Sequence, residues 1–132
     1  MIQKKLYMEY ELQSHSIKAI WTLISTAMGL KKWLADDVQI TDNHISLTWG
    51  ELWSDHETRD ANILELVAYD HIKLQWAEEE GTDTYLEMKI ERIDITEDYI
   101  LCITDYALDG DIDTLREIWN QNLERLHTNT GL

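Results

Sequence analysis

Apolar and polar residues alternate one by one along much of the chain, which is the spacing of strands buried on one face. The alternating segments are residues 5–12, 38–40, 45–49, 63–70, 72–79, 84–93 and 98–104. The pair Asp42-Asn43 is a turn signal and joins the second and third segments into a predicted hairpin. A polar stretch, residues 51–62, interrupts the series. The pattern predicts seven strands in an antiparallel meander.

Three other segments follow the helical period. Residues 17–24 carry apolar side chains three and four positions apart, after Ser14 or Ser16 as a candidate N-cap. A second short helix is predicted within residues 29–37, beyond a polar break. The segment 108–132 carries one long apolar stripe and begins with acidic residues that can cap a helix.

The predicted order is therefore strand, two short helices, six strands and a long helix. Amphipathic strands and an amphipathic helix can hide their apolar faces only against each other, which predicts an α+β fold with the long helix across the sheet. The length of 132 residues suits a single domain, residues 1–132, with one core.

Composition limits the classes of partner. Acidic residues outnumber basic ones by 26 to 11, giving a net charge of −15, so a nucleic-acid backbone would be repelled. The uncharged run between Lys18 and Lys31 is too short and too polar to span a membrane, and no secretory signal is recognised. We expect a cytoplasmic protein without a membrane span. The single cysteine, Cys102, lies in an apolar run and is interpreted as a buried, inert thiol.

Motifs for metal or hydrolytic chemistry are incomplete. The run His56–Asp60 has Asp60 where a zinc-protease motif requires its second histidine. Residues 109–113 place three aspartates at calcium-loop spacing, but Thr114 stands where glycine is needed, so helix capping is the favoured interpretation. The histidines are dispersed, and no serine elbow accompanies them. We predict no catalytic residue, no metal ligand and no cofactor.

Several tryptophan motifs extend over nearly the whole chain. The first comprises Trp21, Leu23, Ile24, Ser25, Trp33, Ala35, Asp36 and Asp37. Further on are Lys73, Leu74 and Trp76, then Trp119, Leu123 and Leu126. With these residues the chain resembles the START-like (SRPBCC, Bet v 1-like) superfamily, close to the homologues of the activator of the heat-shock chaperone ATPase. It departs from that family at Ala27 and Met28, where a proline is common.

This resemblance implies a helix-grip fold, in which a curved antiparallel sheet of about seven strands wraps around the long C-terminal helix, with two short helices after the first strand. It also implies a cavity between helix and sheet, used in many members to hold an apolar or aromatic ligand. The predicted ligand-binding residues are Trp33, Trp49, Trp53, Trp76, Met88, Tyr106, Leu115, Trp119 and Asn122. Trp33 and Trp53 are expected at an entrance, and the others between helix and sheet.

The same pattern is also typical of a plain core, so a solid interior and a ligand-sized cavity both remain open. Asn122 discriminates between them, because an amide on a buried stripe either pairs with a neighbouring side chain or orients a ligand. The favoured function is non-enzymatic binding of a small apolar or aromatic molecule. One alternative is a protein-interaction module akin to the chaperone-activator homologues.

A second alternative is an enzyme of the cyclase or dehydratase kind, which would need an acid or base inside the cavity. The alternation places no Asp, Glu or His clearly on the inward face. A homodimer or another protein partner is a further expectation, because Tyr7, Leu64, Leu66 and Tyr99 are apolar residues predicted at exposed positions.

Overall fold

A computed structural model describes residues 3–50 and 55–132, and within them seven strands form one antiparallel sheet. The strands are β1 (Gln3–Glu11), β2 (Asp37–Thr41), β3 (His44–Trp49), β4 (Glu57–Val67), β5 (His71–Trp76), β6 (Leu86–Ile93) and β7 (Asp98–Leu108). The helices are α1 (Ile17–Ser25), α2 (Ala27–Lys31) and α3 (Ile112–Thr130), with short 3₁₀ turns η1 (Ala77–Glu79) and η2 (Asp109–Asp111).

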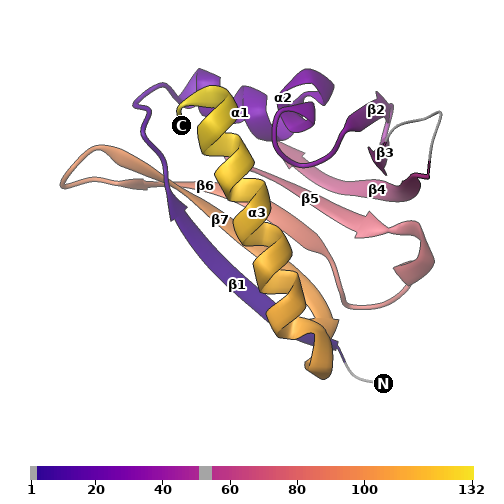
Figure 1. Ribbon diagram of the computed structural model, residues 1–132. Coiled ribbons are helices and arrows are strands. Elements are labelled where there is room, and N and C mark those ends of the chain that lie inside the picture. The colour runs from indigo at the N-terminus through magenta and orange to yellow at the C-terminus, as the bar shows by residue number, and fades with distance from the viewer. Residues whose placement is uncertain (1–2, 51–54) are drawn as a thin grey trace.

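The strand order is β1-β7-β6-β5-β4-β3-β2, so β2 to β7 form a meander and β1 closes onto β7. The curved sheet passes around α3, which crosses its inner face, while α1 and α2 lie beside the C-terminal end of α3 (Figure 1). The predicted α+β helix-grip fold is confirmed. No helix within the described ranges combines the length and the apolar character that crossing a membrane requires.

The two short helices are separated by one residue that serves both of them. Thr26 ends α1 and caps α2, where its hydroxyl accepts a hydrogen bond from the Gly29 backbone N–H at 2.9 Å. The helices pack so closely that a Cβ atom added at Gly29 would lie 1.9 Å from the Thr22 carbonyl oxygen. Ser16 is confirmed as the N-cap of α1, since its hydroxyl accepts from the Ala19 N–H at 3.2 Å.

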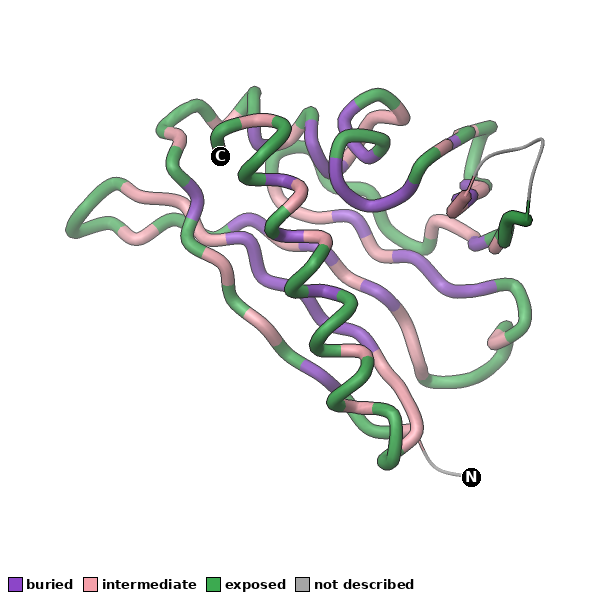
Figure 2. The backbone as a smooth tube through the Cα atoms, in the orientation of Figure 1, coloured by how far each residue is buried: buried purple, intermediate pink, exposed green. Residues whose placement is uncertain are grey.

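The core lies between the inner face of the sheet and the buried stripe of α3 (Figure 2). That stripe consists of Trp119, Leu123 and Leu126. The last turn of α3 is held in place by polar contacts: the Asn129 amide donates to the Lys32 carbonyl at 2.7 Å, and the Leu132 carbonyl accepts from the Gln13 N–H at 3.0 Å. These contacts fix the position of α3 over the sheet.

Several boundary predictions are wrong. The second helix, predicted within residues 29–37, is α2 (Ala27–Lys31), and residues 77–79, predicted as strand, form η1. Residues 57–62, interpreted as part of a polar interruption, form the first half of β4 and pair with β3. The physical reason is that Glu57 and Arg59 occupy inward positions where the sheet borders a cavity instead of solid core. Apolar alternation is therefore missing there, although the backbone is extended. The alternation resumes near Ile63, shortly before a bulge between Ile63 and Glu65.

Candidate functional site

A cavity of about 340 Å³ lies between α3 and the inner face of the sheet. Its described lining comprises Leu34, Leu47, Trp49, Glu57, Arg59, Trp76, Leu86, Asp105, Leu115, Ile118, Trp119 and Asn122. Because Glu57 and Ile118 are exposed, the cavity reaches the protein surface. Most of its wall is apolar, and the charged side chains come from β4 and β7.

Polar contacts fix three tryptophan rings around this cavity. The Trp49 indole N–H donates to the Leu34 carbonyl at 2.9 Å, which ties β3 to the segment after α2. Trp76 faces the guanidinium of Arg59, whose carbon lies 3.8 Å from the ring centroid, a cation–π contact. The Trp119 indole N–H donates to Asp105 Oδ2 at 2.9 Å, which ties α3 to β7. The aromatic walls are therefore held in defined orientations.

Asp105 supplies a buried carboxyl group to the cavity wall. Its side chain is 8% exposed, and its second oxygen accepts the Tyr106 backbone N–H at 2.8 Å. Removal from water raises the pKa of Asp105 from 3.8 to about 6, and the hydrogen bonds from Trp119 and Tyr106 limit that rise. Burial opposes the charged form, while the two donors favour it. The carboxyl group is therefore still largely ionised at neutral pH.

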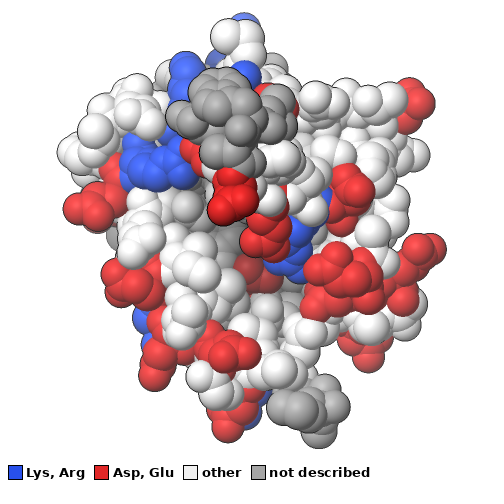
Figure 3. Space-filling model, turned by 45° about the vertical axis from the view of Figure 1, so that its right-hand side comes forward, with Lys and Arg blue, Asp and Glu red and all other residues white. Residues whose placement is uncertain are grey.

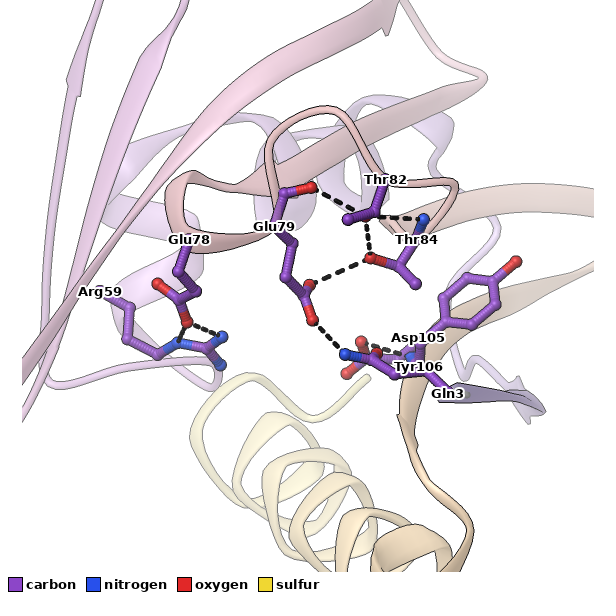
Figure 4. A network of polar contacts seen from close by, with 8 residues as sticks. All are labelled: Gln3, Arg59, Glu78, Glu79, Thr82, Thr84, Asp105 and Tyr106. Atoms are coloured by element: carbon purple, nitrogen blue, oxygen red, sulfur yellow. Dashed lines mark hydrogen bonds and ion pairs between the residues drawn. The ribbon is translucent and has the colours of Figure 1, made fainter. Parts of the chain in front are cut away.

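The loop around η1 carries two further carboxylates, close to the end of the cavity where Arg59 and Asp105 lie. Glu78 accepts two hydrogen bonds from the Arg59 guanidinium, at 2.6 and 3.2 Å. Glu79 accepts from the Gln3 amide at 2.6 Å and from the Thr84 hydroxyl at 3.2 Å, which links the loop to β1 (Figure 4). Among the charged side chains on the face drawn in Figure 3, acidic ones prevail over basic ones, in agreement with the net charge of −15. The opening is thus electrostatically negative.

Five of the predicted site residues line the cavity, and three do not. Trp49, Trp76, Leu115, Trp119 and Asn122 contribute to its wall. Trp33, Met88 and Tyr106 do not contribute. Trp53 lies outside the described residues.

The expectation that Trp33 lies at an entrance is wrong. The side chain is fully buried, and its indole N–H donates to the Leu23 carbonyl at 2.9 Å. Its ring packs against Trp119, with centroids 6.1 Å apart. Leu23 belongs to the last turn of α1, whose carbonyls lack intrahelical partners. Trp33 satisfies one of these carbonyls from the interior, so its role in this structure is to join α1, α2 and α3.

Met88 and Tyr106 are excluded from the cavity for different reasons. Met88 is fully buried and faces inward, but it lies in solid core. Tyr106 lies on the outer face of β7, where its ring meets Tyr85 edge-on with centroids 5.3 Å apart. Because side chains alternate along a strand, the inward position belongs to Asp105. The prediction for Tyr106 therefore identified the correct strand but the wrong face of the sheet.

Three charged residues of the cavity were not predicted: Glu57, Arg59 and Asp105. The first two lie in the stretch interpreted as a polar interruption, so no strand was available to orient them. Asp105 could have been found by extending the inward alternation of Leu101 and Ile103 by one further step. An enzyme of the cyclase or dehydratase kind would require an inward acid or base, and Asp105 meets that requirement by position.

On the outer face of the sheet, Glu9, Glu91 and Cys102 place three potential metal-ligating atoms within 4.8 Å of one another. Both carboxylates are exposed, whereas Cys102 is buried. Burial raises the pKa of the Cys102 thiol, which disfavours the thiolate that a metal would bind. We assign no metal to this cluster.

Comparisons with known proteins agree with this architecture. The protein BfR322 from Bacteroides fragilis, solved in solution, is 34% identical, with 97% of this chain and 91% of that chain covered and a TM-score of 0.65. The Aha1 dimer from Colwellia psychrerythraea has a TM-score of 0.72 at 14% identity, with 97% and 98% covered. An AHSA1-like protein from Aeromonas hydrophila has a TM-score of 0.72 at 8% identity, with 97% and 92% covered. Among curated proteins, none matches the chain.

The latter two similarities concern the fold alone, because their sequence identities are low. The family match is more direct, since the model of the START-like superfamily domain covers residues 1–132. Such membership supports a ligand-binding or interaction domain in general terms, without naming a ligand. The helix-grip sheet, the tryptophan motifs and the match along the full sequence lead to one conclusion: the chain belongs to the START-like superfamily.

Proposed function

We propose that this protein binds a small apolar or aromatic molecule in the cavity between α3 and the sheet, without transforming it. The observation that carries the proposal is the cavity of about 340 Å³ with Trp49, Trp76 and Trp119 in its wall. Ligand sites in proteins are concave, mostly apolar and about 300–1,000 Å³ in volume. A cavity of this size and lining supports a small, mostly apolar aromatic ligand.

Asn122 also supports the proposal, because it places a polar group in the cavity wall. Its amide lines the cavity, and it forms no hydrogen bond with another residue in the described ranges. An amide in this position can donate to and accept from a bound molecule without breaking any existing contact. Of the two roles that the sequence left open for Asn122, orientation of a ligand is the one that we propose.

Filling the cavity is expected to weaken binding of a neutral aromatic probe. In the wild-type protein, N-phenyl-1-naphthylamine should give a saturable rise in fluorescence with one probe per chain. The substitution Leu115→Trp places a larger side chain in the cavity wall and should weaken binding by about tenfold or more, since lost space removes most of the apolar contact. Fluorescence titration measures the affinity, and NMR chemical-shift changes locate the probe.

The matched control is Ile95→Trp, which adds the same ring at a residue that is 95% exposed between β6 and β7. Its affinity for the probe should equal that of the wild-type protein. Absence of saturable binding to the wild type would contradict the proposal. The same holds if the shifts map outside the cavity, or if Leu115→Trp binds as tightly as the control.

A second candidate is self-association, supported by an exposed apolar strip on β4 and the following turn. Leu64, Leu66, Val67 and Tyr69 are between 48% and 55% exposed. The β3 pairing covers only residues 57–62 of β4, so the strip adjoins an edge that β3 leaves open. We call these four residues the β4 apolar edge. Open apolar edges are typical sites of strand pairing between chains.

Replacement of Leu66 by glutamate is expected to dissociate such a dimer, because burying an unpaired carboxylate opposes association. Sedimentation equilibrium at low and high micromolar concentration measures the mass of the wild-type protein and of the variant. Ile95→Glu is the control, since it introduces the same charge away from the β4 apolar edge. A wild-type protein that stays monomeric at the highest concentration argues against this second candidate.

A further inference from the structure

We propose that the cavity selects a molecule whose apolar body ends in a protonated amine, with the ammonium group at Asp105 and the body along the tryptophan walls. This inference rests on the proposed function and specifies its ligand class. It also implies that molecules of the same shape ending in a carboxylate are rejected.

Asp105 carries a buried carboxylate whose ionised form the charge of Arg59 favours from beyond ion-pair distance. Its two hydrogen bonds come from neutral donors, the Trp119 indole and the Tyr106 backbone. Throughout residues 3–50 and 55–132, no Lys, Arg or His forms an ion pair with Asp105 at 4.0 Å or less. Each carboxylate oxygen has a second lone pair, so the group can accept additional hydrogen bonds from the cavity side. A buried carboxylate of this kind favours a cationic donor.

Arg59 is the cationic residue in the described cavity wall. Its guanidinium donates twice to Glu78 and lies against the face of Trp76. These contacts pair its charge with that of Glu78 and occupy its Nε and Nη2 donors. Nη1 forms no hydrogen bond among the described residues, but a carboxylate that approached it would share the guanidinium with the Glu78 carboxylate, whose like charge opposes it.

The charged side chains around the opening are mostly negative. Glu57 and Asp105 line the cavity, whereas the charge of Arg59 is balanced by Glu78. An anionic ligand therefore enters a region where, among the described residues, the carboxylates of Glu57, Glu78 and Asp105 outnumber the Arg59 guanidinium, in a protein whose net charge is −15. The same field attracts a cation and lowers the free energy of its bound state.

The aromatic walls of the cavity also favour a cation. Tryptophan presents the most favourable ring face for a cation, and the contact of Arg59 with Trp76 at 3.8 Å shows that this wall accommodates one. Trp119 turns its indole N–H edge to Asp105, so an ammonium group there is bound by the carboxylate while the apolar body lies along the tryptophan walls. Aliphatic side chains such as Leu86 and Leu115 leave room for the apolar body.

The test compares three probes of matched shape: 3-phenylpropylamine, 3-phenylpropan-1-ol and 3-phenylpropionate. NMR titration of the wild-type protein at neutral pH gives the three affinities and locates the shifts. We expect the amine to bind about tenfold or more tightly than the carboxylate, with the alcohol between them, because a charge-assisted hydrogen bond is roughly twice as strong as a neutral one. Equal affinities, or a preference for the carboxylate, would overturn the inference while leaving the proposed function intact.

The variant Asp105→Asn removes the charge and keeps the shape of the side chain. It should weaken binding of the amine by about tenfold and leave the alcohol within about twofold of the wild type. Asp113→Asn is the matched control, because it removes one exposed charge on α3 outside the cavity wall. Loss of amine affinity in both variants would overturn the assignment to Asp105. Failure of all three probes to bind the wild-type protein would overturn the inference and the proposed function together.

Discussion

Replacement of Trp33 by alanine is expected to lower the free energy of unfolding by about 3–5 kcal/mol, the usual cost of removing a buried tryptophan side chain. Trp33 is fully buried, so its removal leaves a space inside the core. The substitution also removes the hydrogen bond to the Leu23 carbonyl and the contact with Trp119. One side chain therefore supports three helices at once.

Denaturant unfolding followed by circular dichroism measures this effect. Trp21→Ala is the control, because Trp21 is only partly buried and packs against the exposed Tyr69, with ring centroids 6.2 Å apart. It should cost clearly less than Trp33→Ala. A smaller loss, of about 1–3 kcal/mol, is expected for Trp33→Phe, which keeps most of the ring but leaves the Leu23 carbonyl without its donor. Similar losses for Trp33→Ala and Trp21→Ala would contradict the assignment of Trp33 to the core.

The substitution Asp105→Asn is expected to change how stability depends on pH. Burial raises the pKa of Asp105 from 3.8 to about 6, so the folded protein binds this proton more tightly than the unfolded chain does. The corresponding stabilisation is complete below the unfolded pKa and is lost as the pH rises through the folded pKa. The difference between the two pKa values corresponds to about 3 kcal/mol. Asparagine does not titrate, so the variant does not lose stability in this way as the pH rises.

The free energy of unfolding of Asp105→Asn should therefore rise, relative to that of the wild type, by about 3 kcal/mol between about pH 3.5 and about pH 8. Asparagine has one oxygen for two donors, which subtracts about 1 kcal/mol at every pH and does not alter the slope. Urea unfolding at several pH values measures the difference. Asp113→Asn, at an exposed residue, should follow the wild-type curve. Parallel curves for Asp105→Asn and the wild type would contradict the assignment.

The sequence predicts the elements of this protein well where burial is uniform. The stripe containing Trp119, Leu123 and Leu126 has the period of a helix packed on one side, and α3 follows it. In β6 the residues Leu86, Met88 and Ile90 are buried and those between them are more exposed, because one face meets core and the other lies nearer to solvent. The tryptophan motifs then identify the superfamily, since they mark the positions where the short helices and α3 meet.

Prediction fails where an inward position does not meet core. Arg59 and Asp105 point inward, yet they resemble surface residues in sequence because a cavity replaces the apolar neighbours that would otherwise be required. The prediction for Trp33 is also wrong, because the polarity of its neighbours in sequence does not reflect its burial. Trp33 follows two lysines and precedes an acidic pair, which suggests a rim, but the helix break turns it into the interior. Local polarity reports on neighbours in sequence, whereas the cavity is created by elements distant in the chain.

The pairing of β1 with β7 also has a consequence for the order of folding. During synthesis β1 emerges before the other elements, but its partner ends at Leu108, so their contacts span about a hundred residues. The meander from β2 to β7 can form step by step from neighbouring hairpins, whereas β1 must wait. Nearly the whole sheet has therefore left the ribosome before β1 pairs with β7. The helix α3 packs on the inner face of the sheet last.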